Sequence, residues 1–195
     1  MVGHSRATFP GQGDQASRCG TCAHSEFCDA LSRSQAADQF GGGRSRQFFG
    51  AAPGKQIVAH GRATSDVYVL CVGWAFRYLQ LRDGRRQILK FLLPGDLLSP
   101  ELVLDAVPQT SVKALTAVQV AAFSRTDIQA EGGDRDLGWA VTRSLIDDGR
   151  DLNRLLAVIA QMDAETRIAH LLLHLMRRIA TKSVIREECY LLPIR

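Results

Sequence analysis

The chain has 195 residues, 46% hydrophobic and 23% charged, a composition typical of folded globular proteins that excludes a disordered or collagen-like chain. Its formal net charge of +4 is spread thinly, and residues 101–162 carry an acidic excess, so the charge does not mark a nucleic-acid-binding patch. Residues 1–15 lack the apolar core of a secretory signal, and no run reaches the roughly 18 apolar residues of a membrane span. We therefore expect a cytoplasmic protein with no membrane partner.

Three cysteines near the N-terminus form a C-x2-C-x5-C motif: Cys19, Cys22 and Cys28. In a reducing compartment, such short spacings favour thiolate ligands of one metal centre over disulfides. Either zinc or an iron–sulfur cluster fits this set of ligands. The alternative is an N-terminal arm whose cysteines have no ligand role. Cys71 and Cys189 stand apart from the motif.

Three consecutive glycines at 41–43 mark a boundary, so residues 1–43 are predicted to form a separate Cys-rich segment with a short helix over 29–40. From 44 to 133, short apolar runs alternate with turn residues, which predicts a sandwich, barrel or roll of short strands. Within it, Asp83-Gly84 separates two strand-like runs and predicts a hairpin with a type I′ turn.

Between residues 134 and 162 the apolar spacing changes to alternating steps of three and four, which predicts a long helix with a heptad seam. The seam consists of Val141, Leu145, Asp148, Leu152, Leu155, Ile159 and Met162. A seam of this period calls for a partner helix, so we expect a homodimer through this helix. The competing interpretation is that the same stripe packs on the chain's own strands. The carboxylate of Asp148 would weaken a dimer if it were buried there.

A second helix is predicted to begin at Asp163, an N-cap residue followed by an apolar ladder. Residues 163–195 would then be a connector helix and the start of a further domain. His170 and His174 lie four residues apart, but no carboxylate follows His170 as in H-E-x-x-H, so we expect no metal there.

The order of these parts resembles the FNR branch of the CRP/FNR family of bacterial transcription regulators. The resemblance rests on the cysteine motif, the Pro94-Gly95-Asp96-Leu97 turn, the long helix and the Asp163-Ala-Glu-x-Arg-Ile helix start. It implies an α+β fold, in which a cyclic-nucleotide-binding-like β-roll, a jelly roll, carries an N-terminal Cys-rich arm and a long C-terminal dimerisation helix.

The resemblance also implies a regulator, not an enzyme, that senses redox state or oxygen through a [4Fe–4S] cluster. Cys19, Cys22 and Cys28 match the family's N-terminal ligands, but residues 118–123, where the family has its fourth cysteine, contain none. Cys71, the other cysteine of the roll, is one candidate for that place, the competing interpretation being a small core residue. His24, Asp29 and a second chain are the other candidates for completing the site. The family's helix-turn-helix would follow Arg195, so DNA is an expected partner only if such a domain follows.

Nucleotide-binding members of the family present a Glu to the ribose and an Arg to the cyclic phosphate. This chain has Asp96 and Gln109-Thr110 at those places, and without a guanidinium for the phosphate, cyclic AMP is not expected to bind. A second function hypothesis is a zinc-bound or metal-free interaction protein that forms heterodimers with full-length relatives. The sequence carries none of the common hydrolase, zinc-protease, P-loop or dinucleotide-binding motifs.

Overall fold

The computed structural model describes residues 26–33, 47–130 and 135–182. They belong to two compact units, Met1–Leu145 and Ile146–Arg195, which are described separately. The boundary between the units lies inside the long helix. No helix within the described ranges is both long and apolar enough to cross a bilayer.

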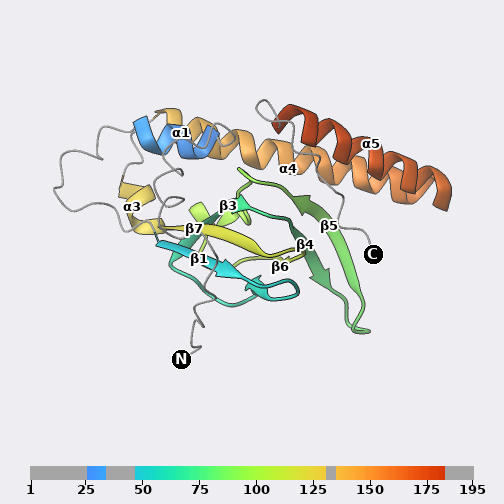
Figure 1. Ribbon diagram of the computed structural model, residues 1–195, viewed down its shortest axis with the longest axis horizontal. Helices are drawn as coiled ribbons and strands as arrows, with labels where there is room; N and C mark the ends of the chain where they lie inside the picture. Colours follow the sequence, from blue (N-terminus) through green and yellow to red (C-terminus); the bar gives the residue numbers. More distant parts are fainter. Residues whose placement is uncertain (1–25, 34–46, 131–134, 183–195) are drawn as a thin grey trace. The chain divides into compact units, whose positions relative to one another are not determined.

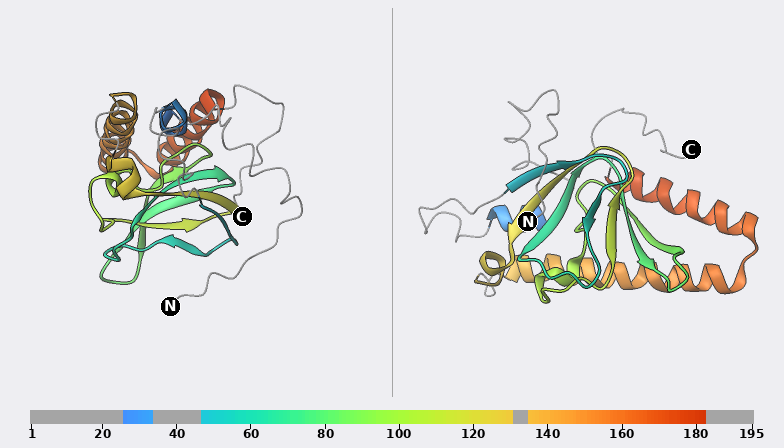
Figure 2. Two further views of the ribbon diagram at one scale, coloured as in Figure 1. Left: turned by 90° about the vertical axis from the view of Figure 1, so that its left-hand side faces the viewer. Right: turned by 90° about the horizontal axis from the view of Figure 1, so that it is seen from below.

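The first unit is a roll of two antiparallel sheets (Figures 1 and 2). One sheet has the strand order β1-β7-β3 and the other β2-β6-β4-β5. The strands are β1 (Gln47–Ala51), β2 (Gln56–Val58), β3 (Asp66–Val72), β4 (Ala75–Gln80), β5 (Arg86–Leu92), β6 (Ser111–Ala114) and β7 (Val118–Ser124). The predicted β-roll is thereby confirmed.

Helices precede and follow the roll in the sequence, and one short 3-10 helix lies between strands β5 and β6. They are α1 (Glu26–Arg33), the 3-10 helix η2 (Pro100–Val103), α3 (Arg125–Ala130), α4 (Arg135–Gln161) and α5 (Ala164–Lys182). The predicted long helix corresponds to α4. The short N-terminal helix begins at Glu26, earlier than predicted, because Phe27 and Cys28 already belong to its buried face while Glu26 and Asp29 place negative charge in its first turn.

Strands β3 and β7 bury both of their faces. Leu70 and Val120 are partners in the sheet register, as are Val67 and Phe123, and all four side chains are buried. Because successive strand residues point to opposite sides, the two pairs lie on opposite faces of the sheet. The near-continuous apolar runs of β3 and β7 in the sequence follow from this two-sided burial.

The β4–β5 hairpin closes differently from the prediction. The Gly84 amide donates to the Leu81 carbonyl (3.0 Å) and the Leu81 amide to the Arg85 carbonyl (2.8 Å), so Arg82 and Asp83 are the central residues of the turn. The predicted type I′ turn centred on Asp83-Gly84 is therefore wrong. Gly84 follows the turn in the left-handed region, at φ +84°, which is typical of a three-residue hairpin loop.

In the second unit, α5 begins as predicted. Asp163 is the N-cap: its carboxylate accepts a hydrogen bond from the Thr166 amide (2.8 Å), and this bond lowers the pKa of Asp163. Arg167 donates to the carbonyls of Met162 and Ile159 (both 2.8 Å) at the C-terminal end of α4. The end of α4 and the start of α5 are thus joined by one side chain, and the two helices form a hairpin (Figures 1 and 2).

Gly73 provides a test of the turn between β3 and β4. A Cβ on Gly73 would lie 2.2 Å from the Ala117 carbonyl oxygen, and its φ of +85° is unfavourable for any L side chain. We expect Gly73→Ala to lower the free energy of unfolding by about 3 kcal/mol or more, combining backbone strain and overlap. Gly61→Ala is the matched control, because Gly61 also has a positive φ (+72°) but no atom within 4 Å of the added Cβ. Gly61→Ala should lower the free energy of unfolding by about 1–2 kcal/mol. Urea denaturation measures both variants, and equal decreases would contradict the steric argument.

Candidate functional site

Helix α1 carries the third cysteine of the motif into the core of the first unit. Phe27, Cys28 and Ala30 are buried, whereas Glu26 and Asp29 are exposed, so the helix has one apolar face. Cys28 is 2% exposed. The structure therefore makes this predicted ligand a packed core residue.

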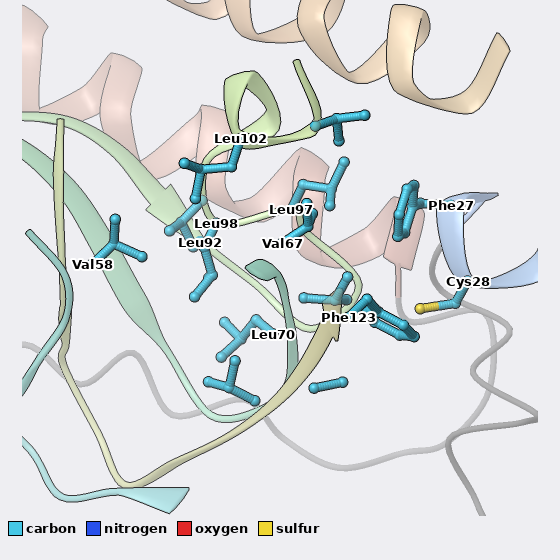
Figure 3. Close-up of a cluster of buried hydrophobic side chains, with 14 of the residues drawn as sticks. Phe27, Cys28, Val58, Val67, Leu70, Leu92, Leu97, Leu98, Leu102 and Phe123 are labelled. Carbon is cyan, nitrogen blue, oxygen red and sulfur yellow. The ribbon is translucent and has the colours of Figure 1, made fainter. Parts of the chain in front are cut away.

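Two contacts hold α1 in place. The Phe27 ring meets the Phe123 ring of β7 edge-on, with centroids 6.0 Å apart, and Figure 3 shows the Cys28 sulfur pointing toward Phe123. On the exposed side, Glu26 forms an ion pair with Arg143 of α4 at 3.5 Å. An exposed pair of this kind contributes little energy, so the aromatic contact and the burial of α1 dominate.

The first part of α4 packs on the same core as α1. Leu137, Ala140 and Val141 are buried members of that hydrophobic cluster, and Leu145 packs partly against it. For Val141 and Leu145, the structure thus matches the competing interpretation, in which the stripe packs on the chain's own domain. Their place in a dimer seam stays a prediction.

The remaining seam residues lie in the second unit and are less covered. Asp148, Leu155 and Met162 are half-buried, whereas Leu152 and Ile159 are each 40% exposed. This part of α4 presents apolar side chains to solvent, which is what an unpaired seam would show.

Cys71 lies on β3, half-buried, with its thiol 3.8 Å from the Val69 carbonyl oxygen. It sits at an irregularity of the β3–β7 register, next to the pair of Val72 and Gln119. Phe123, which Cys28 faces, is four residues from Gln119 along β7, or about 13 Å at strand spacing. The structure does not bring Cys71 and Cys28 together, and Cys71 as the fourth ligand stays a prediction.

The residues described here do not form a metal centre in this conformation. Within the described ranges, no three His, Cys, Asp or Glu side chains are grouped so that they could hold a metal ion. Cys19, Cys22 and Cys189 lie outside those ranges. Of the predicted motif, only Cys28 can be placed, and its surroundings are apolar. The described residues therefore do not fit an iron–sulfur cluster or zinc in this state.

Helix α5 carries His170 and His174, and within the described residues neither belongs to a group of three possible metal ligands. His174 approaches Asp151 of α4, with Nε2 and Oδ1 4.0 Å apart and both side chains largely buried. The histidine takes part in packing the helical hairpin, where the buried Val158 and Leu175 also lie.

Arg77 is a buried cation of the roll that the sequence analysis missed. It is 7% exposed, and its guanidinium donates to the carbonyls of Leu98 (3.0 Å) and Leu97 (3.3 Å). The available signal was the strand periodicity of β4, which places residue 77 on the same side as the buried Ala75. Its bonds hold the segment that follows the Pro94-Gly95 turn against β4.

The residues at the family's nucleotide-binding positions have other roles in this chain. The Asp96 carboxylate accepts from the Leu93 amide (2.8 Å) and so stabilises the turn. Gln109 is exposed and donates to the Val107 carbonyl (3.3 Å). Within the described part of the chain, the hydroxyls of Ser99 and Thr110 are buried without a hydrogen-bond partner. Position 109 carries an amide side chain and not a guanidinium, so it supplies no positive charge for a phosphate.

A comparison with known protein families supports the assignment of the fold as a β-roll. Residues 50–131 match the family described as the cyclic nucleotide-binding domain. The nitrogen fixation regulation protein FixK of Rhizobium meliloti (strain 1021) is 32% identical over 126 residues, which cover 65% of this chain and 56% of FixK. The chain thus spans little more than half of that relative's length.

Two solved structures share the architecture. FixK2 from Bradyrhizobium japonicum superposes with a TM-score of 0.63 at 25% identity, covering 68% of this chain and 67% of FixK2. The c-di-GMP-responsive global regulator CLP of Xanthomonas campestris has a TM-score of 0.59 at 15% identity, with 65% of each chain covered, which shows the fold alone.

The roll, with its helices, is therefore a cyclic nucleotide-binding domain in fold. Beyond this domain, the chain is similar to FixK and FixK2 over about two thirds of its own length. The relative FixK is described as a nitrogen fixation regulation protein, which agrees with the expectation of a regulator.

The replaced nucleotide-binding residues make a direct prediction. We expect 1 mM cyclic AMP to leave the midpoint of thermal unfolding unchanged. A ligand that binds the native state stabilises it by RT ln(1 + [L]/Kd), and 1 mM is roughly 100 times or more the Kd of a tightly bound nucleotide. Differential scanning fluorimetry with and without the nucleotide measures this. A concentration-dependent rise of several degrees would contradict it.

Proposed function

We propose that this chain forms the sensory and dimerisation part of a CRP/FNR-type transcription regulator. In this proposal the N-terminal motif of Cys19, Cys22 and Cys28 binds a [4Fe–4S] cluster and receives a redox or oxygen signal. The observation that carries the proposal is that α1, which contains Cys28, contacts both β7 and α4. The relationship to FixK and FixK2 supports the regulatory role.

A route for the signal lies within the first unit. Phe27 connects α1 to β7, and Glu26 connects it to α4 at Arg143. Leu137 and Val141, on the first turns of α4, share the core with α1. Because these groups are close-packed, a displacement of α1 changes the support of the α4 N-terminal part.

The output of the sensory part is proposed to be homodimerisation through α4. Leu152 and Ile159 are each 40% exposed, so covering the rest of each side chain with a second copy would contribute about 1 kcal/mol. Asp148, half-buried on the same stripe, would oppose this association and keep the dimer weak enough to respond to a signal. DNA recognition needs a pair of recognition helices, so in our proposal it belongs to the whole protein and not to the described residues.

Anaerobic reconstitution with ferrous iron and sulfide tests the cluster. The wild-type chain should gain about four irons and four sulfides with broad visible absorption that fades in air. Cys19→Ser and Cys22→Ser should abolish this uptake, and Cys189→Ser, outside the motif, should leave it unchanged. Cys71→Ser tests the fourth ligand. A chain that retains tightly bound colourless zinc and takes up no iron would overturn the cluster and support the interaction-protein alternative.

Substitutions on α4 test the dimer. Leu152→Lys and Ile159→Lys should each weaken self-association at least about tenfold, because each places a charge in the proposed seam. Leu173→Lys is the matched control, since Leu173 is also exposed but lies on α5, outside the seam. Sedimentation velocity over a concentration series measures the effect. Equal behaviour of the three variants would count against α4 as the dimer interface.

A further inference from the structure

In the second unit, a histidine of α5 lies beside a carboxylate of α4. Nε2 of His174 is 4.0 Å from Oδ1 of Asp151, and the two side chains are 26% and 19% exposed. We propose that this pair makes the stability of the α4–α5 hairpin depend on pH, so that protonation of His174 strengthens the contact between the two helices. The inference rests on neither the proposed cluster nor the proposed dimer.

The distance between the two groups makes their contact depend on charge. A hydrogen bond between nitrogen and oxygen needs a separation of about 2.7–3.2 Å, and His174 and Asp151 are farther apart than that. A neutral imidazole attracts a carboxylate only weakly, whereas an imidazolium forms a charge-assisted hydrogen bond with it. Protonation therefore adds an attraction that draws α5 toward α4.

The ionisable side chains around the pair favour the protonated form. Asp148 lies one turn from Asp151 on α4, while His170 and Arg178 lie one turn before and after His174 on α5. All of these side chains are half-buried, and the other charged side chains of this unit whose exposure is described are exposed. With neutral histidines, the half-buried groups comprise two carboxylates and one guanidinium. A proton on His174 supplies the positive charge that balances them.

Two effects oppose protonation, and both are limited. Burial disfavours an imidazolium, but His174 keeps 26% of its side chain exposed, so its loss of hydration is incomplete. Arg178 also carries positive charge, but Cβ atoms four residues apart on a helix are about 5–6 Å from each other, and a long arginine side chain can extend away. The carboxylate of Asp151 is already within 4.0 Å, so its attraction is expected to dominate.

The direction of the pH dependence follows from linkage. A histidine in an unfolded chain titrates near about pH 6.5. We expect Asp151 to raise the pKa of His174 above this value in the hairpin, because the carboxylate stabilises the imidazolium. The added stability is then fully present below about pH 6.5 and is lost as the pH rises through the titration of the folded state.

Hydrogen exchange of the full chain measures this dependence. Exchange is followed by mass spectrometry at about pH 5.5 and about pH 8.0, on either side of the expected titration, and is corrected for the intrinsic rates at each pH. Protection of the α5 amides should be about three- to tenfold greater at the lower pH, since one pH unit between the two titrations corresponds to a factor of ten. Equal protection, or weaker protection at the lower pH, would overturn the inference.

Matched variants assign the effect to the pair. His174→Gln and Asp151→Asn should each remove the pH dependence. His170→Gln should retain it, because His170 is also a half-buried histidine of α5 but lies a turn away from the pair. Asp147→Asn should retain it as well, because Asp147 is exposed and pairs with Arg150. A dependence that survives His174→Gln, or that His170→Gln removes, would contradict the proposal.

An NMR titration of the wild-type chain keeps the test decisive if a variant disturbs folding. The ring-proton resonances of the histidines are followed from about pH 5 to 9 in the native and the urea-denatured chain. The titration midpoint of His174 should be higher in the native chain than in the denatured chain. An equal or lower midpoint in the native chain would show that the hairpin does not favour the imidazolium and would overturn the inference.

Discussion

The packing of β7 is the constraint on which the rest of the first unit depends. This strand pairs with β1 on one side and β3 on the other, and its residues are buried on both faces. One face contributes Val120 to the interior of the roll. The opposite face carries Phe123, whose ring packs edge-on against the ring of Phe27 in α1. Because one strand supports both the roll and the docked helix, a movement of α1 cannot be local to the N-terminal arm.

The same sulfur chemistry that suggests a metal ligand also explains why Cys28 packs well in a core. A cysteine thiol behaves as a small apolar side chain when it is protonated and as a soft metal ligand when it is not. In α1 the structure shows the first of these two properties, since the helix buries Cys28 together with Phe27. A helix of eight residues gains modest stability from such burial.

The interior of the roll has been adapted in a different way. Arg77 uses its guanidinium to bind the Leu97 and Leu98 carbonyls, and Asp96 closes the preceding turn through the Leu93 amide. Polar groups that could face a ligand serve here to shape the backbone. The fold is that of a cyclic nucleotide-binding domain, and a fold by itself does not specify which ligand is bound.

Local signals in the sequence determined the fold class and most elements. These signals are the short apolar runs of the strands, the apolar period of the long helix and the N-cap residue Asp163. The sequence also marked Cys28 as a candidate ligand by its spacing. Only the tertiary structure decided that Cys28 faces Phe123, that Arg77 is buried, and that Val141 packs on its own domain. The loop form around Gly84 was likewise decided by strand pairing. These properties depend on which residues distant in sequence become neighbours in space. The apolar period of a strand or helix predicts that a side chain is buried, but not which residues cover it.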